Sequence, residues 1–129
     1  MILVAYVPRA EGRAAVHKGI EMAKLMRESL LVVNGSAGTT VDDESIAPRD
    51  DVREIEKELA ASGVKAEFMQ LIRGKPPAEE IASIVETQSV SMLVIGLRKR
   101  TLVGKLFLGS VAQEMLLSVS CPVLAVKAH

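Results

Sequence analysis

Short apolar runs that alternate with stretches of helical periodicity constrain the fold of this chain more than any other feature. Four continuous apolar runs, rich in β-branched residues, lie at 2–7, 30–34, 92–96 and 122–127. Runs of this length and composition are typical of strands buried on both faces of a sheet. A weaker fifth run at 64–72 alternates apolar and polar residues, as an edge strand does.

The segments between these runs repeat their apolar residues with the period of an α-helix. The pattern predicts helices over 12–28, 50–61, 77–88 and 110–119. Strict alternation of strand and helix requires crossover connections, and these produce a parallel sheet covered by helices on both faces. We therefore predict an α/β fold, a three-layer sandwich with a five-stranded parallel sheet.

In an open parallel sheet the ligand site lies beyond the carboxyl ends of the strands, where the strand order reverses. This rule directs attention to the connections after the first, second and fourth strands. The connection after the second strand, over 34–51, is rich in Gly, Ser, Thr, Asp and Pro and has no periodicity. We expect a mobile surface loop over 35–50, either a lid over the site or a solvated connector.

Composition excludes several classes of function. The 129 residues suit one domain over 1–129, and 16 basic residues balance 16 acidic ones. A net charge of zero and 2% aromatic residues argue against a nucleic-acid-binding protein, and we expect no membrane partner. A single cysteine and the absence of a leader peptide from the start of this sequence favour a cytoplasmic location.

The segment 96–110, GLRKRTLVGKLFLGS, combines glycine with basic residues directly after the fourth apolar run. Ser110 is expected to cap the following helix, whose free backbone N–H groups attract phosphate oxygens. The segment lacks the Walker spacing, and 7–14 lacks a dinucleotide-binding fingerprint. It is either an anion-binding loop or a solvated connector.

At this segment the sequence resembles the universal stress protein family, whose members often carry G-x2-G-x9-G-S/T after the fourth strand. Here the spacing runs from Gly96 through Lys99 to Gly109 and Ser110, and the chain closes with SCPVLAVK at 120–127. The resemblance covers essentially the whole chain. It implies the strand order 3-2-1-4-5 of the adenine nucleotide alpha hydrolase-like fold, and binding of ATP or AMP.

Two departures from the family pattern lie at the implied site. Lys99 replaces the second glycine of the motif, where its ammonium group can reach a phosphate. The first strand reads AYVPRA over 5–10, without the Asp that nucleotide-binding members usually carry near its end. Backbone groups around Tyr6 and Val7 remain to hydrogen-bond an adenine edge.

The residues expected at the nucleotide follow mainly from the resemblance. It implies contacts to the base, to the ribose and to the phosphates. Arg98 and Arg100 are added to these on charge alone. In chain order the predicted nucleotide-binding residues are Ala5, Tyr6, Val7, Val33, Gly96, Arg98, Lys99, Arg100, Gly109, Ser110 and Val111.

Other chemistry has little support in the sequence. His17 and His129 lack a third histidine for zinc, and Cys121 is expected to be buried and inert. The acidic run 42–44 is a candidate for Mg²⁺ only if the ion accompanies a nucleotide. No catalytic residue is predicted, and we expect any ATP hydrolysis to be slow.

The resemblance also implies a homodimer paired through the C-terminal strand 122–127. Two functions remain open at this stage. One is a regulatory, stress-response module that binds an adenine nucleotide. The alternative is a dimeric structural or protein-interaction module with a vestigial pocket.

Overall fold

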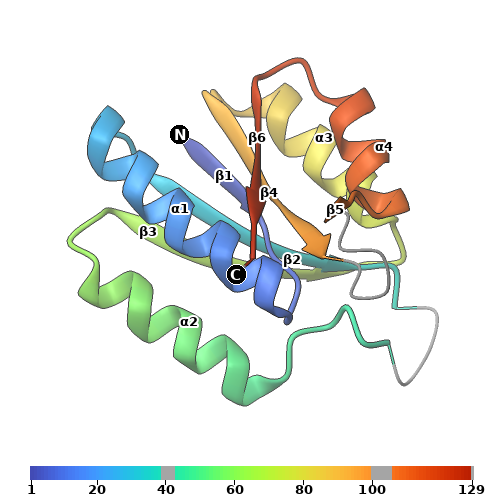
Figure 1. The fold of residues 1–129 in the computed structure, drawn as a ribbon, viewed down its shortest axis with the longest axis horizontal. Coiled ribbons are helices and arrows are strands. Elements are labelled where there is room, and N and C mark those ends of the chain that lie inside the picture. Colours follow the sequence, from blue (N-terminus) through green and yellow to red (C-terminus); the bar gives the residue numbers. More distant parts are fainter. Residues whose placement is uncertain (39–42, 100–105, 129) are drawn as a thin grey trace.

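The computed structural model describes residues 1–38, 43–99 and 106–128 of the chain. Strands and helices alternate along it, as Figure 1 shows. In chain order the elements are β1 (Ile2–Ala5), α1 (Ala10–Met26), β2 (Leu30–Ser36), α2 (Arg49–Ala61), β3 (Ala66–Ile72), α3 (Pro77–Thr87), β4 (Met92–Lys99), β5 (Leu106–Phe107), α4 (Ser110–Ser118) and β6 (Val123–Lys127).

The parallel strands form one sheet in the order β3-β2-β1-β4-β6. Because β6 is the fifth parallel strand along the chain, this is the predicted order 3-2-1-4-5. The short β5 was not foreseen. It pairs antiparallel with the end of β4, with Arg98 opposite Phe107 and Lys99 opposite Leu106.

Successive residues of each central strand enter opposite halves of the core. Ile2 and Val4 pack in one apolar cluster with residues of α1 and α2, whereas Leu3 packs in the other with residues of α3 and α4. Figure 1 shows α1 and α2 on one face of the sheet and α3 and α4 on the other. Each fully buried side chain of this kind contributes about 1.5–3 kcal/mol relative to its exposed state. Burial on both faces explains why these strands read as continuous apolar runs.

Several element boundaries differ from the sequence predictions. β2 extends to Ser36 and α2 begins at Arg49, so two residues at each end of the predicted loop 35–50 belong to regular structure. β1 ends at Ala5, two residues earlier than predicted, whereas β4 continues to Lys99. The part of the predicted loop at 39–42 lies outside the described residues. No helix in the described ranges is long and apolar enough to cross a membrane.

Candidate functional site

A cavity of about 500 Å³ opens at the carboxyl ends of β1, β2 and β4. This is where the rule for open parallel sheets places a ligand, because the strand order reverses at β1. β2 lies on one side of β1 and β4 on the other. Both walls come from segments far apart in the sequence. The lining residues are Ala5, Tyr6, Val7, Arg9, Glu11, Val33, Gly35, Ser36, Ala37, Asp43, Ser45, Pro77, Ile81, Ile95, Gly96, Arg98, Gly109, Ser110, Val111, Ala112 and Met115.

Two glycines bring the first turn of α1 against the ends of β1 and β4. A Cβ added at Gly12 would lie 1.8 Å from the carbonyl oxygen of Val7, and one at Gly96 would lie 2.3 Å from that of Glu11. Real Cβ atoms do not approach backbone atoms so closely, so both positions require glycine. Gly96 therefore has a packing role, which fixes the backbone of Glu11 beside β4.

The amino end of α4 forms another part of the wall. Gly109 is the N-cap and makes no side-chain capping hydrogen bond, and Ser110 is the first helical residue. The prediction that Ser110 caps this helix is therefore wrong by one residue. The first N–H groups of a helix have no intrahelical partner and carry its positive dipole end. Because Ser110, Val111 and Ala112 line the cavity, this wall attracts anions.

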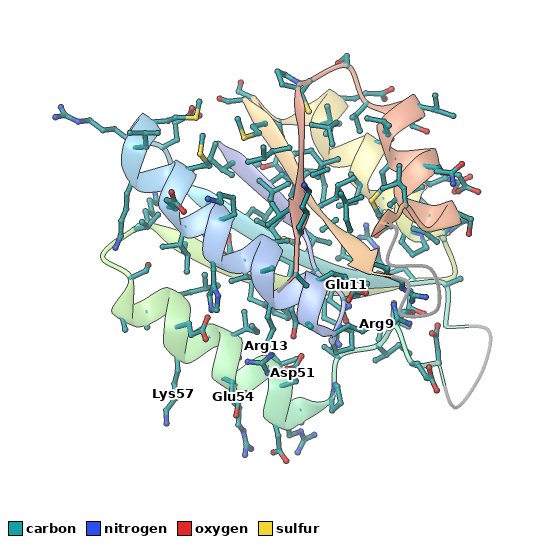
Figure 2. The ribbon with its side chains drawn as sticks, in the orientation of Figure 1. Arg9, Glu11, Arg13, Asp51, Glu54 and Lys57 are labelled. Carbon is teal, nitrogen blue, oxygen red and sulfur yellow. The ribbon has the colours of Figure 1, made fainter. Side chains whose placement is uncertain are left out.

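Charged side chains of both signs surround the cavity. The Arg98 Nε donates to Oε1 of Glu11 at 3.3 Å, and the Glu11 side chain is only 12% exposed. Asp43 accepts hydrogen bonds from the side chains of Ser36 and Ser45 and from the Ser45 amide at 2.9 Å. These bonds, the one from Ser36 foremost, lower the pKa of Asp43, and the nearby Arg9 lowers it further. Figure 2 shows Arg9 and Glu11 at the same end of α1.

Asn34, two residues before the end of β2, holds the segment before α2 against the sheet. Its amide nitrogen donates to the carbonyl oxygens of Tyr6 at 3.0 Å and Ser45 at 2.8 Å. Its oxygen accepts from the Ala47 amide at 2.9 Å and from Gln70 Nε2 at 3.0 Å. The Asn34 side chain is fully buried, and these four hydrogen bonds satisfy its polar atoms. It therefore holds Ser45 at the cavity.

Tyr6 connects the cavity to α2. Its hydroxyl donates to Oδ2 of Asp51 at 2.5 Å, and Asp51 also pairs with Arg13, which bonds Glu54 at 2.8 Å. Figure 2 shows Arg13 from α1 directed toward Asp51 and Glu54 of α2. Burial of the ring, followed by the hydrogen bond and the negative charge of Asp51, raises the pKa of Tyr6.

The backbone of Tyr6 is already engaged in the structure. Its N–H donates to the Val33 carbonyl at 2.8 Å, and its carbonyl accepts from Asn34. The Tyr6 N–H is therefore already paired within the sheet. The Val7 carbonyl likewise accepts from the Arg9 amide at 2.8 Å.

The structure brings together the predicted site residues whose side chains it describes. Lys99 is described only through its backbone in β4, and Arg100 lies outside the described residues. The predicted residues that line the cavity are Ala5, Tyr6, Val7, Val33, Gly96, Arg98, Gly109, Ser110 and Val111.

The cavity also has a polar wall, in which sequence reasoning missed Arg9, Glu11, Ser36 and Ser45. Asp43 of the same wall was considered only as a candidate for Mg²⁺ that accompanies a nucleotide. The position of Glu11 just after the first strand was the one available signal, because that strand ends at the ligand side of the sheet. Nothing in the sequence indicated that Asp43 would turn back to Ser36.

The remaining candidates lie away from the cavity or are engaged elsewhere. His17 is exposed and contacts Glu58 at 3.2 Å, and Cys121 is half-buried. Asp42 of the acidic run lies outside the described residues. Among the residues that the structure describes, no group of three His, Cys, Asp or Glu side chains is arranged to hold a metal ion.

Comparison with known proteins decides the family. The model of the universal stress protein family matches residues 1–127. The chain belongs to this family. A universal stress protein of Mycolicibacterium smegmatis is 45% identical over 129 residues, which are all of this chain and 98% of that relative.

Solved structures of the family share the fold of this universal stress protein. One from Archaeoglobus fulgidus is 29% identical with a TM-score of 0.76, and the match covers 98% of this chain and 97% of that one. The A. fulgidus universal stress protein in complex with dAMP is 26% identical with a TM-score of 0.73, over 98% and 96% of the two chains. These matches confirm the adenine nucleotide alpha hydrolase-like fold predicted from the sequence.

Proposed function

We propose that this universal stress protein binds an adenine nucleotide, AMP or ATP, and acts as a regulatory module in a stress response. The cavity at the switch point of the sheet, with the amino end of α4 in its wall, carries the proposal. A neighbour of the same fold, 26% identical, is described in complex with dAMP, which supports an adenine nucleotide as the ligand.

The chemistry of the cavity suits the two ends of such a ligand. Its volume of about 500 Å³ lies within the 300–1,000 Å³ usual for small-molecule sites. Val33, Ile81 and Met115 supply apolar surface for a base. The α4 N–H groups and Arg98 supply donors for a phosphate. Lys99 and Arg100 remain predicted phosphate contacts, and Mg²⁺ would enter only with the nucleotide.

We further propose that the protein is not an enzyme and that any ATP hydrolysis is slow. A general base must be within reach of the attacking water. The carboxylates in the described part of the cavity wall are already engaged, Glu11 by Arg98 and Asp43 by Ser36 and Ser45. Such carboxylates position donors rather than accept a proton from water.

The proposed assembly is a cytoplasmic homodimer that pairs two β6 strands. Within the described residues β6 pairs with β4 along one edge, and it lies at the end of the sheet. An edge strand rich in apolar residues is prone to pair with another chain. Sedimentation equilibrium tests this, because proline at the exposed Ala125 would remove a strand N–H and should yield monomers if the dimer uses this edge.

The alternative function, an interaction module with a vestigial pocket, has one observation in its favour. Arg98, the described basic side chain of the G-x2-K-x9-G-S segment, is already paired with Glu11. Under this alternative the basic segment binds an acidic protein partner and the cavity stays empty.

Calorimetric titration of the purified protein with AMP, ATP and inorganic phosphate, with and without Mg²⁺, distinguishes the two functions. A Gly109→Leu variant tests the site, because a Cβ at Gly109 meets no heavy atom within 4 Å and the fold should tolerate the larger side chain. We expect nucleotide binding that Gly109→Leu weakens at least tenfold (~1.4 kcal/mol). Ala61→Leu, an exposed change at the end of α2, is the control and should bind normally. Absence of heat with either nucleotide at millimolar concentration would favour the interaction module.

A further inference from the structure

The contact between Glu11 and Arg98 joins a fixed carboxylate to a more exposed guanidinium. The Glu11 side chain is 12% exposed, whereas that of Arg98 is 47% exposed. The backbone of Glu11 is held by the close approach of Gly96 to its carbonyl oxygen. Because long exposed side chains change rotamer readily, Arg98 can leave this contact while Glu11 stays in place.

Both groups line the cavity proposed to bind a nucleotide. The 3.3 Å contact uses the Nε of Arg98, one of five N–H donors of the guanidinium. A phosphate that approaches Arg98 therefore competes with the Glu11 carboxylate for the same cation. The phosphate also comes close to the negative charge of Glu11. Because Glu11 is largely buried, salt screens this repulsion only weakly.

We propose that Glu11 is a specificity-determining residue of the cavity, which holds Arg98 in the unliganded protein and disfavours ligands in proportion to their negative charge. This inference rests on the proposed function, because it assumes that the phosphate reaches Arg98. The penalty is greater for ATP than for AMP, so Glu11 biases the site toward the monophosphate. Glu11 acts through charge and need not touch the ligand.

The test compares AMP and ATP affinities of the wild type, Glu11→Gln, Arg98→Gln and the double variant by calorimetry at low ionic strength. Glu11→Gln should tighten AMP binding about tenfold and ATP binding by a larger factor, because the isosteric amide removes the charge. In the Arg98→Gln background the gain from Glu11→Gln should be smaller, because the competition for Arg98 is lost. Glu11→Ala repeats the loss of charge if the amide perturbs folding. Glu21→Gln, an exposed change on the same helix, should leave both affinities unchanged.

The outcomes separate this inference from the proposed function. If the wild type binds AMP and Glu11→Gln binds it no more tightly, the role of Glu11 is refuted and nucleotide binding stands. If Glu11→Gln binds AMP more weakly than the wild type, the role of Glu11 is also refuted, because the carboxylate would then favour nucleotide binding. If neither protein binds either nucleotide at millimolar concentration, both proposals fail. Binding by Glu11→Gln alone would support both.

Discussion

A negative charge at Ser110 should separate the stability of α4 from its ability to hold a phosphate. Ser110 is the exposed first residue of the helix, after an N-cap without a side-chain capping bond. An aspartate there complements the helix dipole and should stabilise the fold by about 0.3–1 kcal/mol. For a domain of this size the melting temperature should then rise by about 1–4 °C.

The same aspartate should weaken binding of a phosphate at the amino end of α4. Two unit charges about 5 Å apart interact by about 3 kcal/mol at an effective dielectric constant of 20. Because the side chain is exposed, screening reduces this to about 1.4–2.7 kcal/mol, a ten- to hundredfold loss of AMP affinity. Thermal denaturation and calorimetric titration on the same samples measure the two effects.

Ser118→Asp at the other end of the helix is the matched control. The same substitution there opposes the dipole, so it should destabilise the protein by about 0.3–1 kcal/mol without changing AMP affinity. A Ser110→Asp variant that melts higher but binds AMP as tightly as the wild type would refute a phosphate site at this helix end. Equal loss of affinity in both variants would show a general effect of charge.

Two further predictions concern the residues that shape the cavity. Gly96→Ala should destabilise the protein by about 1–3 kcal/mol in urea denaturation, because its Cβ would overlap the Glu11 backbone. The stability of Gly109→Ala should stay within about 0.5 kcal/mol of the wild type. Equal effects of the two changes would contradict the packing role of Gly96. Tyr6 is the only tyrosine and the chain has no tryptophan, so an ultraviolet titration reports this residue alone. Its raised pKa predicts that tyrosinate forms well above pH 10, and that stability falls as pH rises past about 10 because the unfolded chain then loses the proton first. A normal pKa would refute the buried contact with Asp51.

The sequence was sufficient to predict the sheet and the end of it that holds the cavity. Neighbours such as Ile2 and Leu3 enter opposite clusters, and burial of that kind leaves a continuous apolar run that can be recognised without coordinates. The carboxyl ends of parallel strands then meet at one edge by geometry alone. The individual cavity residues at the strand ends were predicted mainly from the resemblance to the universal stress protein family, which agrees with this geometry.

The polar wall of the cavity depends on contacts between residues distant in sequence and could not be predicted in the same way. In the sequence Glu11 resembles any acidic residue in the first turn of a helix. It faces Arg98 because Gly96, on another strand, admits its backbone. The partners of Asn34 include Ser45 and Gln70, which no periodicity connects to it. The capping error at Ser110 has a local cause, since glycine and serine are both common N-caps.

Asn34 also has a consequence for the chemical ageing of the protein. It precedes Gly35, and asparaginyl-glycine is the sequence most prone to deamidation, in which the following backbone nitrogen attacks the side-chain amide. In the folded chain this nitrogen belongs to a paired strand and the amide is held by its four partners, so formation of the cyclic succinimide intermediate is strongly disfavoured. Unfolding removes this protection. The aspartate produced would place a carboxylate against the carbonyl oxygens of Tyr6 and Ser45, which it cannot hydrogen-bond. A molecule that has reacted while unfolded should therefore refold to the native cavity less readily.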